Sequence, residues 1–252
     1  LDEFLKDKRA RREPNTISTY EKHAKHLRKG FPVSLRIGDI QAKQVADYLA
    51  STRGEADPAT LEVRNLESNA MAESGKFKEA GALIEQTLAH AATLPVGNEV
   101  RLEAERQQAN TVFALGDRPG ARALQQALFD RESGSRAADD PMLLALQLDL
   151  GLSMGRMGDN AEARAIFEDI YARRLESLGA EHDDTLGVMG RLAVMRAMDG
   201  DTEEAVALQR KRAEISVRKL GAEHPYTLSE RGNLANMLLD LREYDEAEQI
   251  MR

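Results

Sequence analysis

The stretch "LGAEHDDTL" at residues 178–186 returns as "LGAEHPYTL" at residues 220–228, which is an interval of 42 residues. A catalytic motif needs only one copy. A structural unit that stacks on its own kind needs the same turn in every copy, because each copy must offer the same face to its neighbour. The repeated stretch therefore indicates a repeat architecture and not an active site.

Further positions recur when each copy is counted from its leading leucine. The leading leucines are Leu61, Leu102, Leu144, Leu186 and Leu228. Nineteen residues after each stands an alanine: Ala80, Ala121, Ala163, Ala205 and Ala247. Fourteen residues after each stand Gly75, Gly116, Gly158 and Gly200, with Arg242 in the last copy. Seven residues after each stands a small residue: Ser68, Ala109, Gly151, Ala193 and Ala235. The chain is therefore expected to hold five copies of one unit.

Each recurring position has a mechanical interpretation. Apolar residues at helical spacing mark a first helix, A, which the glycine ends by turning through a positive φ. A second helix, B, begins with acidic residues, as in "DTEEA" at 201–205, which suits the helix dipole. The small residues and the alanine let the two helices approach closely. We expect repeats at residues 57–98, 99–140, 141–182, 183–224 and 225–252, the last one truncated.

These residues resemble the tetratricopeptide repeat (TPR) family in its 42-residue, kinesin-light-chain-like variety. The line "LGAEHPYTL…NLA…L…YDEAE" of the fifth copy is the closest match. The first two copies carry Glu67 and Gln108 where the later copies have Leu150, Leu192 and Leu234. The resemblance implies an all-α, right-handed superhelical solenoid over residues 57–252, preceded by a small helical segment. It also implies a concave face, lined by the A helices, that holds partner peptides in extended form.

With the leading leucine as position 1, the concave face should collect positions 2, 5, 9, 12 and 13. Asparagine suits a peptide backbone because its amide both donates and accepts hydrogen bonds. Arg106 and Asn110 stand one helical turn apart and could reach one acidic group. The alternative is that such residues are solvated polar residues on a helix surface. The candidate groove residues are Asn65, Asn69, Arg106, Asn110, Leu148, Leu152, Arg156, Val194, Met198 and Asn236.

The first 56 residues do not follow the repeat. They carry twelve Lys and Arg against eight Asp and Glu, whereas the rest of the chain carries 23 against 35. "NTISTY" at 15–20 and "LRIGDIQAKQVADYLA" at 35–50 resemble the SAM-like core-binding domain of phage-type integrases. The resemblance implies DNA contact through basic helices. The alternative is a helical cap on the solenoid. The candidate DNA contacts are Arg9, Arg11, Arg12, Lys22, Lys25, Arg28 and Lys29.

Catalytic and metal-binding patterns are not found in the sequence. The chain has no cysteine, which excludes disulfides and thiolate metal sites. His182 and His224 recur at one repeat position, which favours a structural turn over a metal site. His23 and His26 alone make a weak metal motif. We expect no enzymatic activity, no cofactor and no metal. The catalytic residues of integrases belong to a further domain, so recombinase activity is not expected.

The function expected from the sequence is that of a non-catalytic interaction scaffold, which binds a protein or peptide in its groove. One alternative is a DNA-associated adaptor that uses the basic N-terminal helices. Another is the regulatory arm of a larger signalling protein, since the chain starts at Leu1 and stops inside a helical pattern. We further expect a cytoplasmic location, no membrane span, and an oligomer, if one forms, through the solenoid ends.

Overall fold

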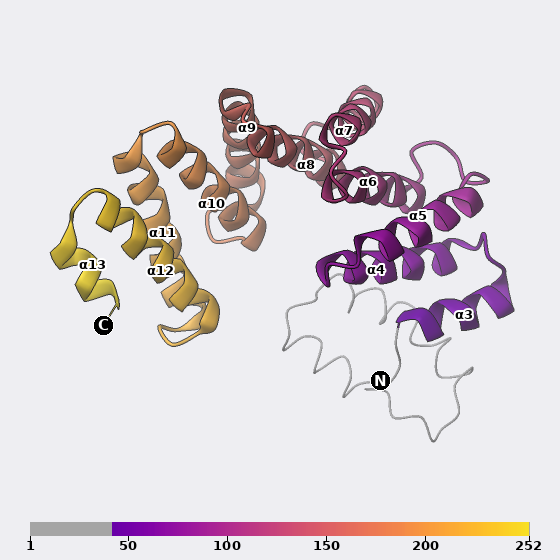
Figure 1. Cartoon of the computed structure of the whole chain (residues 1–252), viewed down its shortest axis with the longest axis horizontal. Coiled ribbons are helices and arrows are strands. Elements are labelled where there is room, and N and C mark those ends of the chain that lie inside the picture. The colour runs from indigo at the N-terminus through magenta and orange to yellow at the C-terminus, as the bar shows by residue number, and fades with distance from the viewer. Residues whose placement is uncertain (1–41, 252) are drawn as a thin grey trace, which may run out of the picture. The chain divides into compact units, whose positions relative to one another are not determined.

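The computed structural model describes residues 42–251, and this range contains α-helices and no β-strand (Figure 1). The all-α fold class is therefore confirmed for the described residues. The helices are α3 (Ala42–Arg53), α4 (Pro58–Glu73), α5 (Phe77–Ala91), α6 (Glu99–Ala114), α7 (Arg118–Ser133), α8 (Pro141–Met157), α9 (Asn160–Leu178), α10 (Asp183–Met198), α11 (Thr202–Leu220), α12 (Pro225–Asp240) and α13 (Tyr244–Met251).

Helices α4 to α13 follow one another as A and B helices. The A helices are α4, α6, α8, α10 and α12, and each leading leucine lies in the first turns of one of them. The chain forms two compact units, of which the first ends at Leu124 and the second begins at Gln125, inside α7. The separation of a segment 1–56 from a solenoid 57–252 stays a prediction, because residues 1–41 lie outside the described range.

Within each unit, helices that follow one another in sequence pack side by side (Figure 1). In the first unit, α3 packs on α4, and α4 packs on both α5 and α6. In the second unit, the contacts run from α8 to α9, and on in order through α10, α11 and α12 to α13. These contacts within each unit are those expected for a stack of repeats.

The residue before each A helix is its N-cap, and its side chain accepts a backbone N–H of the first turn. The five caps are Asp57, Asn98, Asp140, His182 and His224. The Nδ1 atom of His182 accepts from the backbone of Asp184 at 3.2 Å, and that of His224 from Tyr226 at 3.1 Å. The repeated histidine is thus a helix cap, which satisfies a backbone donor that the helix leaves unpaired.

A threonine precedes the leading leucine in the first, fourth and fifth repeats, and it joins each of these repeats to the segment in front of it. Thr185 and Thr227 are fully buried, and their hydroxyls donate to the carbonyls of Arg174 at 3.3 Å and Ser216 at 3.2 Å. Thr60 donates in the same way to Gly54, at 3.0 Å, directly after α3. Helix α3 therefore takes the place of a B helix in front of the first repeat. This stacking bond is one reason why the chain repeats the stretch.

The turns between A and B helices need a left-handed residue. Gly75, Gly116, Gly158 and Gly200 have φ values between 77° and 105°, and Arg242 adopts 65° at the equivalent position. Among the described residues, Arg242 is the one non-glycine with a positive φ. A side chain in this conformation costs about 1–2 kcal/mol because its Cβ crowds the following carbonyl. The repeat geometry is therefore retained in the last copy even without the glycine.

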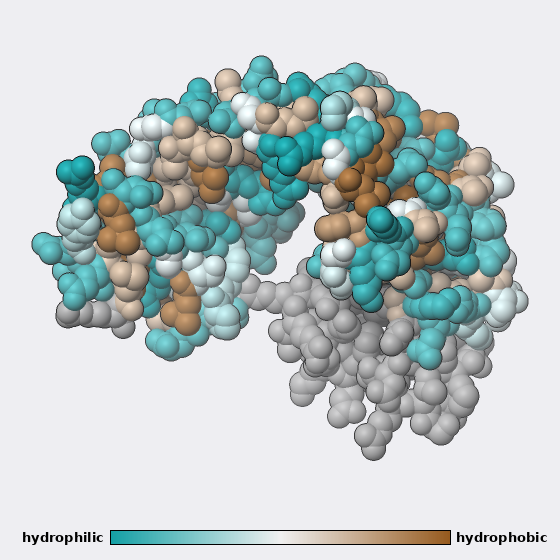
Figure 2. Space-filling model, in the orientation of Figure 1, coloured by the Kyte–Doolittle hydropathy of each residue, from teal (hydrophilic) through white to brown (hydrophobic). Residues whose placement is uncertain are grey.

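The recurring alanines lie at the centre of the packing between helices, where each is fully buried. In the second unit Ala163 joins an apolar core that includes Leu150, Phe167, Ile170 and Leu192, and Ala247 joins a second one with Leu234 and Leu238. The described surface is largely hydrophilic on the face that Figure 2 shows, with separate hydrophobic patches. Among residues 42–251, no helix is both long enough and apolar enough to cross a membrane.

Candidate functional site

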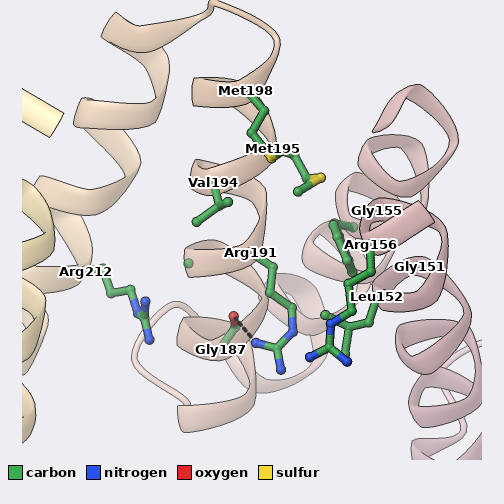
Figure 3. Close-up of a pocket in the computed structure, with 12 residues that line it drawn as sticks. Gly151, Leu152, Gly155, Arg156, Gly187, Arg191, Val194, Met195, Met198 and Arg212 are labelled. Atoms are coloured by element: carbon green, nitrogen blue, oxygen red, sulfur yellow. Dashed lines mark hydrogen bonds between the residues drawn. The ribbon is translucent and has the colours of Figure 1, made fainter. Parts of the chain in front are cut away.

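The second unit contains an open cavity of about 500 Å³ between helices α8, α10 and α11 (Figure 3). A cavity of this size can hold a few side chains of a ligand. Glycines of α8 and α10 and the ring of Phe167 form much of its wall. The lining residues are Gly151, Leu152, Gly155, Arg156, Phe167, Gly187, Gly190, Arg191, Val194, Met195, Met198 and Arg212.

One part of the cavity is apolar and open to solvent. The side chains of Val194 and Met198, on α10, are 47% and 58% exposed. Leu152 of α8 is half-buried and packs against the core of the unit. Exposed apolar side chains gathered in a cavity are typical of binding sites. This part of the cavity would accept an aliphatic or aromatic group.

The other part of the cavity is basic. Arg156 comes from α8, Arg191 from α10 and Arg212 from α11. Figure 3 shows the guanidinium groups of Arg156 and Arg191 on the same side of the cavity. Arg191 donates from Nη1 to the carbonyl of Gly187 at 3.5 Å, and its Nε is buried without a hydrogen-bond partner. The cavity thus collects cationic donors of the kind that pair with anions.

The pKa of Arg191 is lowered from its ordinary value. Burial is the largest cause, and the positive charges of Arg212, Arg156 and Arg174 add to it. The carboxylate of Asp149 acts in the opposite direction. A charged group that is half-buried among like charges is costly, and such groups cluster at functional sites.

Arg212 is held in place from the other side, by helix α12. Its Nη1 lies 3.0 Å from a carboxylate oxygen of Glu230, and its Nη2 donates to the hydroxyl of Tyr226 at 2.6 Å. Glu230 is 2% exposed and also accepts from Nε2 of Gln209 at 2.8 Å. The guanidinium group lies over Gly190 of α10, where an added Cβ would stand 2.1 Å from Nη1. Because Gly190 has no side chain, the guanidinium group of Arg212 can lie beside the cavity.

Four of the groove residues expected from the sequence line this cavity: Leu152, Arg156, Val194 and Met198. Leu148 is half-buried and packs against the core of the second unit. Asn236 is exposed on α12 and does not line the cavity. The structure thus brings together candidates from two consecutive A helices.

The candidates of the first unit lie on α4 and α6. Asn65 is only 4% exposed, and its amide donates to the carbonyl of Val100 at 2.9 Å. Its amide group therefore joins α4 to α6 and is not presented to a ligand. Asn69 is exposed and donates to Glu73. Arg106 pairs with Glu103 of its own helix, at 2.9 Å from Nε, and Asn110 is half-buried on the same helix.

Two of the three arginines of the cavity were not among the candidates predicted from the sequence. Arg191 stands at position 6 of its repeat, next to the expected concave position 5, and Arg212 lies on a B helix. Gly190 was not among the candidate groove residues either. Its equivalents in the first three repeats are larger, and a glycine at such a position can mark the close approach of another group. The candidate DNA contacts, from Arg9 to Lys29, lie outside the described residues.

Comparisons with known proteins agree with this architecture. Family models of the tetratricopeptide repeat match residues 143–216 and 227–252. A solved Podosopora anserina protein classed as a kinesin light chain, with nearly identical TPR-like repeats, is 26% identical. It covers 77% of this chain and 92% of its own, with a TM-score of 0.65. Residues 143–216 and 227–252 therefore match the tetratricopeptide repeat, and the fold of the chain is similar to that of this kinesin-light-chain-like repeat protein.

Two other solved structures share the fold at 14% identity. BtubC from P. vanneervenii covers 83% of this chain and 84% of its own, with a TM-score of 0.69. The second is the Rap conjugation gene regulator of plasmid pLS20, solved with the Phr* peptide. The match covers 87% of this chain and 57% of the regulator, with a TM-score of 0.59. The chain matches no curated protein. The matched family models give no support to the integrase-like resemblance.

Proposed function

We propose that the chain is a non-catalytic interaction scaffold whose second unit binds an extended peptide segment of a partner protein in the cavity between α8, α10 and α11. One observation carries this proposal: exposed Val194 and Met198 lie beside three arginines in one open cavity. The tetratricopeptide repeats support a role in protein interaction. The residues that line the cavity suit binding by apolar contact and charge, and we propose no reaction there.

A peptide fits this cavity better than a small apolar molecule does. The apolar side chains lie toward the C-terminal end of α10, and Arg191 precedes Val194 and Met198 on the same helix. A ligand that uses both parts must present an apolar group and an anionic or carbonyl group several ångströms apart. Successive side chains of an extended peptide meet this requirement, because the rise is about 3.3 Å per residue.

A matched pair of glycine substitutions tests the proposal. Gly187 lines the cavity, and Gly232 occupies a helix outside it; a Cβ at either one meets nothing within 4 Å. Gly187→Trp should fill the cavity without disturbing the helix, whereas Gly232→Trp should leave the cavity open. The measurement is fluorescence anisotropy of a labelled degenerate nine-residue peptide pool, titrated with the full chain.

We expect the wild-type chain and Gly232→Trp to bind the pool alike. Gly187→Trp should bind it at least about tenfold more weakly, because the apolar contacts are lost. Equal binding by the two variants, or no binding by the wild-type chain, would overturn the proposal.

The other functions considered from the sequence stay predictions. DNA binding depends on basic residues outside the described range, and no observation on residues 42–251 favours it. A cytoplasmic location, self-association through the solenoid ends and a place in a larger signalling protein are likewise predictions.

A further inference from the structure

The basic part of the cavity holds more positive than negative charge. Three arginines, Arg156, Arg174 and Arg212, act on Arg191, and one carboxylate, Asp149, opposes them. Glu230 pairs with Arg212. Of the residues that line the cavity, Arg156, Arg191 and Arg212 are basic and none is acidic. An excess of this kind inside a cavity is compensated most directly by an anionic ligand.

Arg191 is the group most in need of such a ligand. It forms no salt bridge with a described residue, and its Nε is buried with no hydrogen-bond partner. An arginine that served only packing would be expected to find a carboxylate or several carbonyls, because an unpaired buried charge is destabilising. Arg212 also has a buried Nε without a partner, although its two terminal nitrogens are engaged.

We propose that Arg156, Arg191 and Arg212 form a phosphoryl-binding site, which recognises a phosphorylated side chain of the bound peptide while an adjacent apolar residue contacts Val194 and Met198. This inference rests on the proposed function of the same cavity. It goes further by naming the chemistry of the group that the peptide must carry.

The charge balance favours a phosphoryl group over a carboxylate. A phosphorylated side chain carries nearly two negative charges at neutral pH, whereas a carboxylate carries one. Its three oxygens can accept hydrogen bonds from several guanidinium groups, and three arginines line this cavity.

Gly190 is the residue that decides whether the third arginine takes part. An added Cβ would stand 2.1 Å from Nη1 and 2.6 Å from Cζ of Arg212, so the guanidinium group would have to move away. The atoms that must move are at the end of a flexible side chain, and the helix itself should be undisturbed. Replacing Arg212 is a poorer test, because it would leave Glu230 buried without its cation.

The test uses three fluorescein-labelled degenerate peptide pools that differ only in the central residue, which is phosphoserine, aspartate or serine. Each is titrated by anisotropy with the full chain at near-physiological salt. The expected order is phosphoserine first, aspartate at least about tenfold weaker, and serine weakest. Gly190→Ala should weaken binding of the phosphoserine pool by about tenfold, whereas Gly232→Ala, at a glycine outside the cavity where an added Cβ meets nothing within 4 Å, should change it by less than about twofold.

Arg191→Gln provides a second variant with nearly the same shape and without the charge. It should remove most of the preference for phosphoserine over serine, while circular dichroism and thermal melting stay those of a folded helical protein. A preference that survives both Gly190→Ala and Arg191→Gln would overturn the inference. Equal binding of the aspartate and phosphoserine pools would also overturn it, in favour of a carboxylate site.

The two proposals can fail separately. If the three pools bind equally well and Gly187→Trp abolishes binding of them all, the peptide-binding function stands and the phosphoryl site is wrong. If the phosphoserine pool binds best and Gly187→Trp, Gly190→Ala and Arg191→Gln all weaken it, both are supported.

Discussion

The two units use the same repeat position in opposite ways. At position 5, the first unit has Asn65 and Arg106. The amide of Asn65 donates to the carbonyl of Val100, and the guanidinium group of Arg106 pairs with Glu103. The second unit has Leu148, Gly190 and Gly232 at this position, and a guanidinium group from another helix lies over Gly190. At Asn65 the position therefore joins two helices, whereas at Gly190 it leaves room for Arg212 beside the cavity.

Position 7 shows the same difference in the core. The second unit has Leu150, Leu192 and Leu234 there, all at most 5% exposed. The first unit has Glu67, whose pKa is raised chiefly by burial, while the positive charge of Lys43 opposes this shift. Next to it, Ser68 donates to Gln107 across α4 and α6. The second unit is therefore held by apolar contacts where the first uses polar ones.

The largest effect is expected from Phe167→Ala in the second unit. Phe167 is 1% exposed in the core of α8, α9 and α10, so its removal should cost about 3–5 kcal/mol in unfolding free energy. Hydrogen exchange should quicken in these helices and stay unchanged in α4 to α6. The control is Leu175→Ala on the same helix, at a residue 38% exposed. Equal loss of protection in both units would contradict their separation.

A smaller effect is expected from Asn65→Ala in the first unit. It leaves the carbonyl of Val100 without this donor inside the α4–α6 contact, which should cost about 1–3 kcal/mol. Asn69→Ala, one turn further along α4 and exposed, should change stability by less than about 0.5 kcal/mol. Urea denaturation of both variants measures the difference. Similar losses at the two residues would mean that Asn65 does not hold the helices together.

The smallest effect is expected when Glu67, at position 7 of the first repeat, is replaced by the leucine that the second unit has at this position. Glu67→Leu should raise the unfolding free energy at pH 7 by about 1 kcal/mol, since it buries an apolar group and removes a poorly solvated charge. Urea denaturation at neutral and acidic pH measures the gain. Glu73→Leu, at an exposed residue of the same helix, is the control and should give little gain.

The sign of the pH dependence follows from the raised pKa. In the folded chain Glu67 binds its proton more readily than in the unfolded chain, so its ionised form is a cost to folding above the folded pKa. This cost disappears as the pH falls through the folded pKa to the lower, unfolded one. The advantage of Glu67→Leu over the wild-type chain should therefore shrink on acidification. An advantage that grows in acid would show that burial of Glu67 is not costly.

Much of the fold was predictable because it depends on single residue types at fixed intervals. A buried alanine, a left-handed glycine and a helix-capping residue each do one local task, and a 42-residue interval reveals them. Four cavity residues were predictable for the same reason, since their positions on an A helix follow from the frame.

The remainder of the site was not predictable, because it depends on contacts between elements that no interval links. Arg212 reaches the cavity from a B helix, and only the distance to Gly190 shows that it can. Asn65 looked like a ligand-binding amide, yet it is buried against the neighbouring A helix. The repeat determines the position of each Cα atom on its helix. The packing of the neighbouring repeat determines which group the polar end of the side chain contacts.

The threonine that joins consecutive repeats has a consequence for how such a chain can change in length. Thr185 and Thr227 bond to main-chain carbonyls, and the identity of the side chain that they face does not matter. A copy gained or lost by unequal crossing-over between the nearly identical stretches would meet the same carbonyl in its new neighbour. Such rearrangements can therefore add or remove a whole binding surface in one genetic event and keep the stacking bonds on either side.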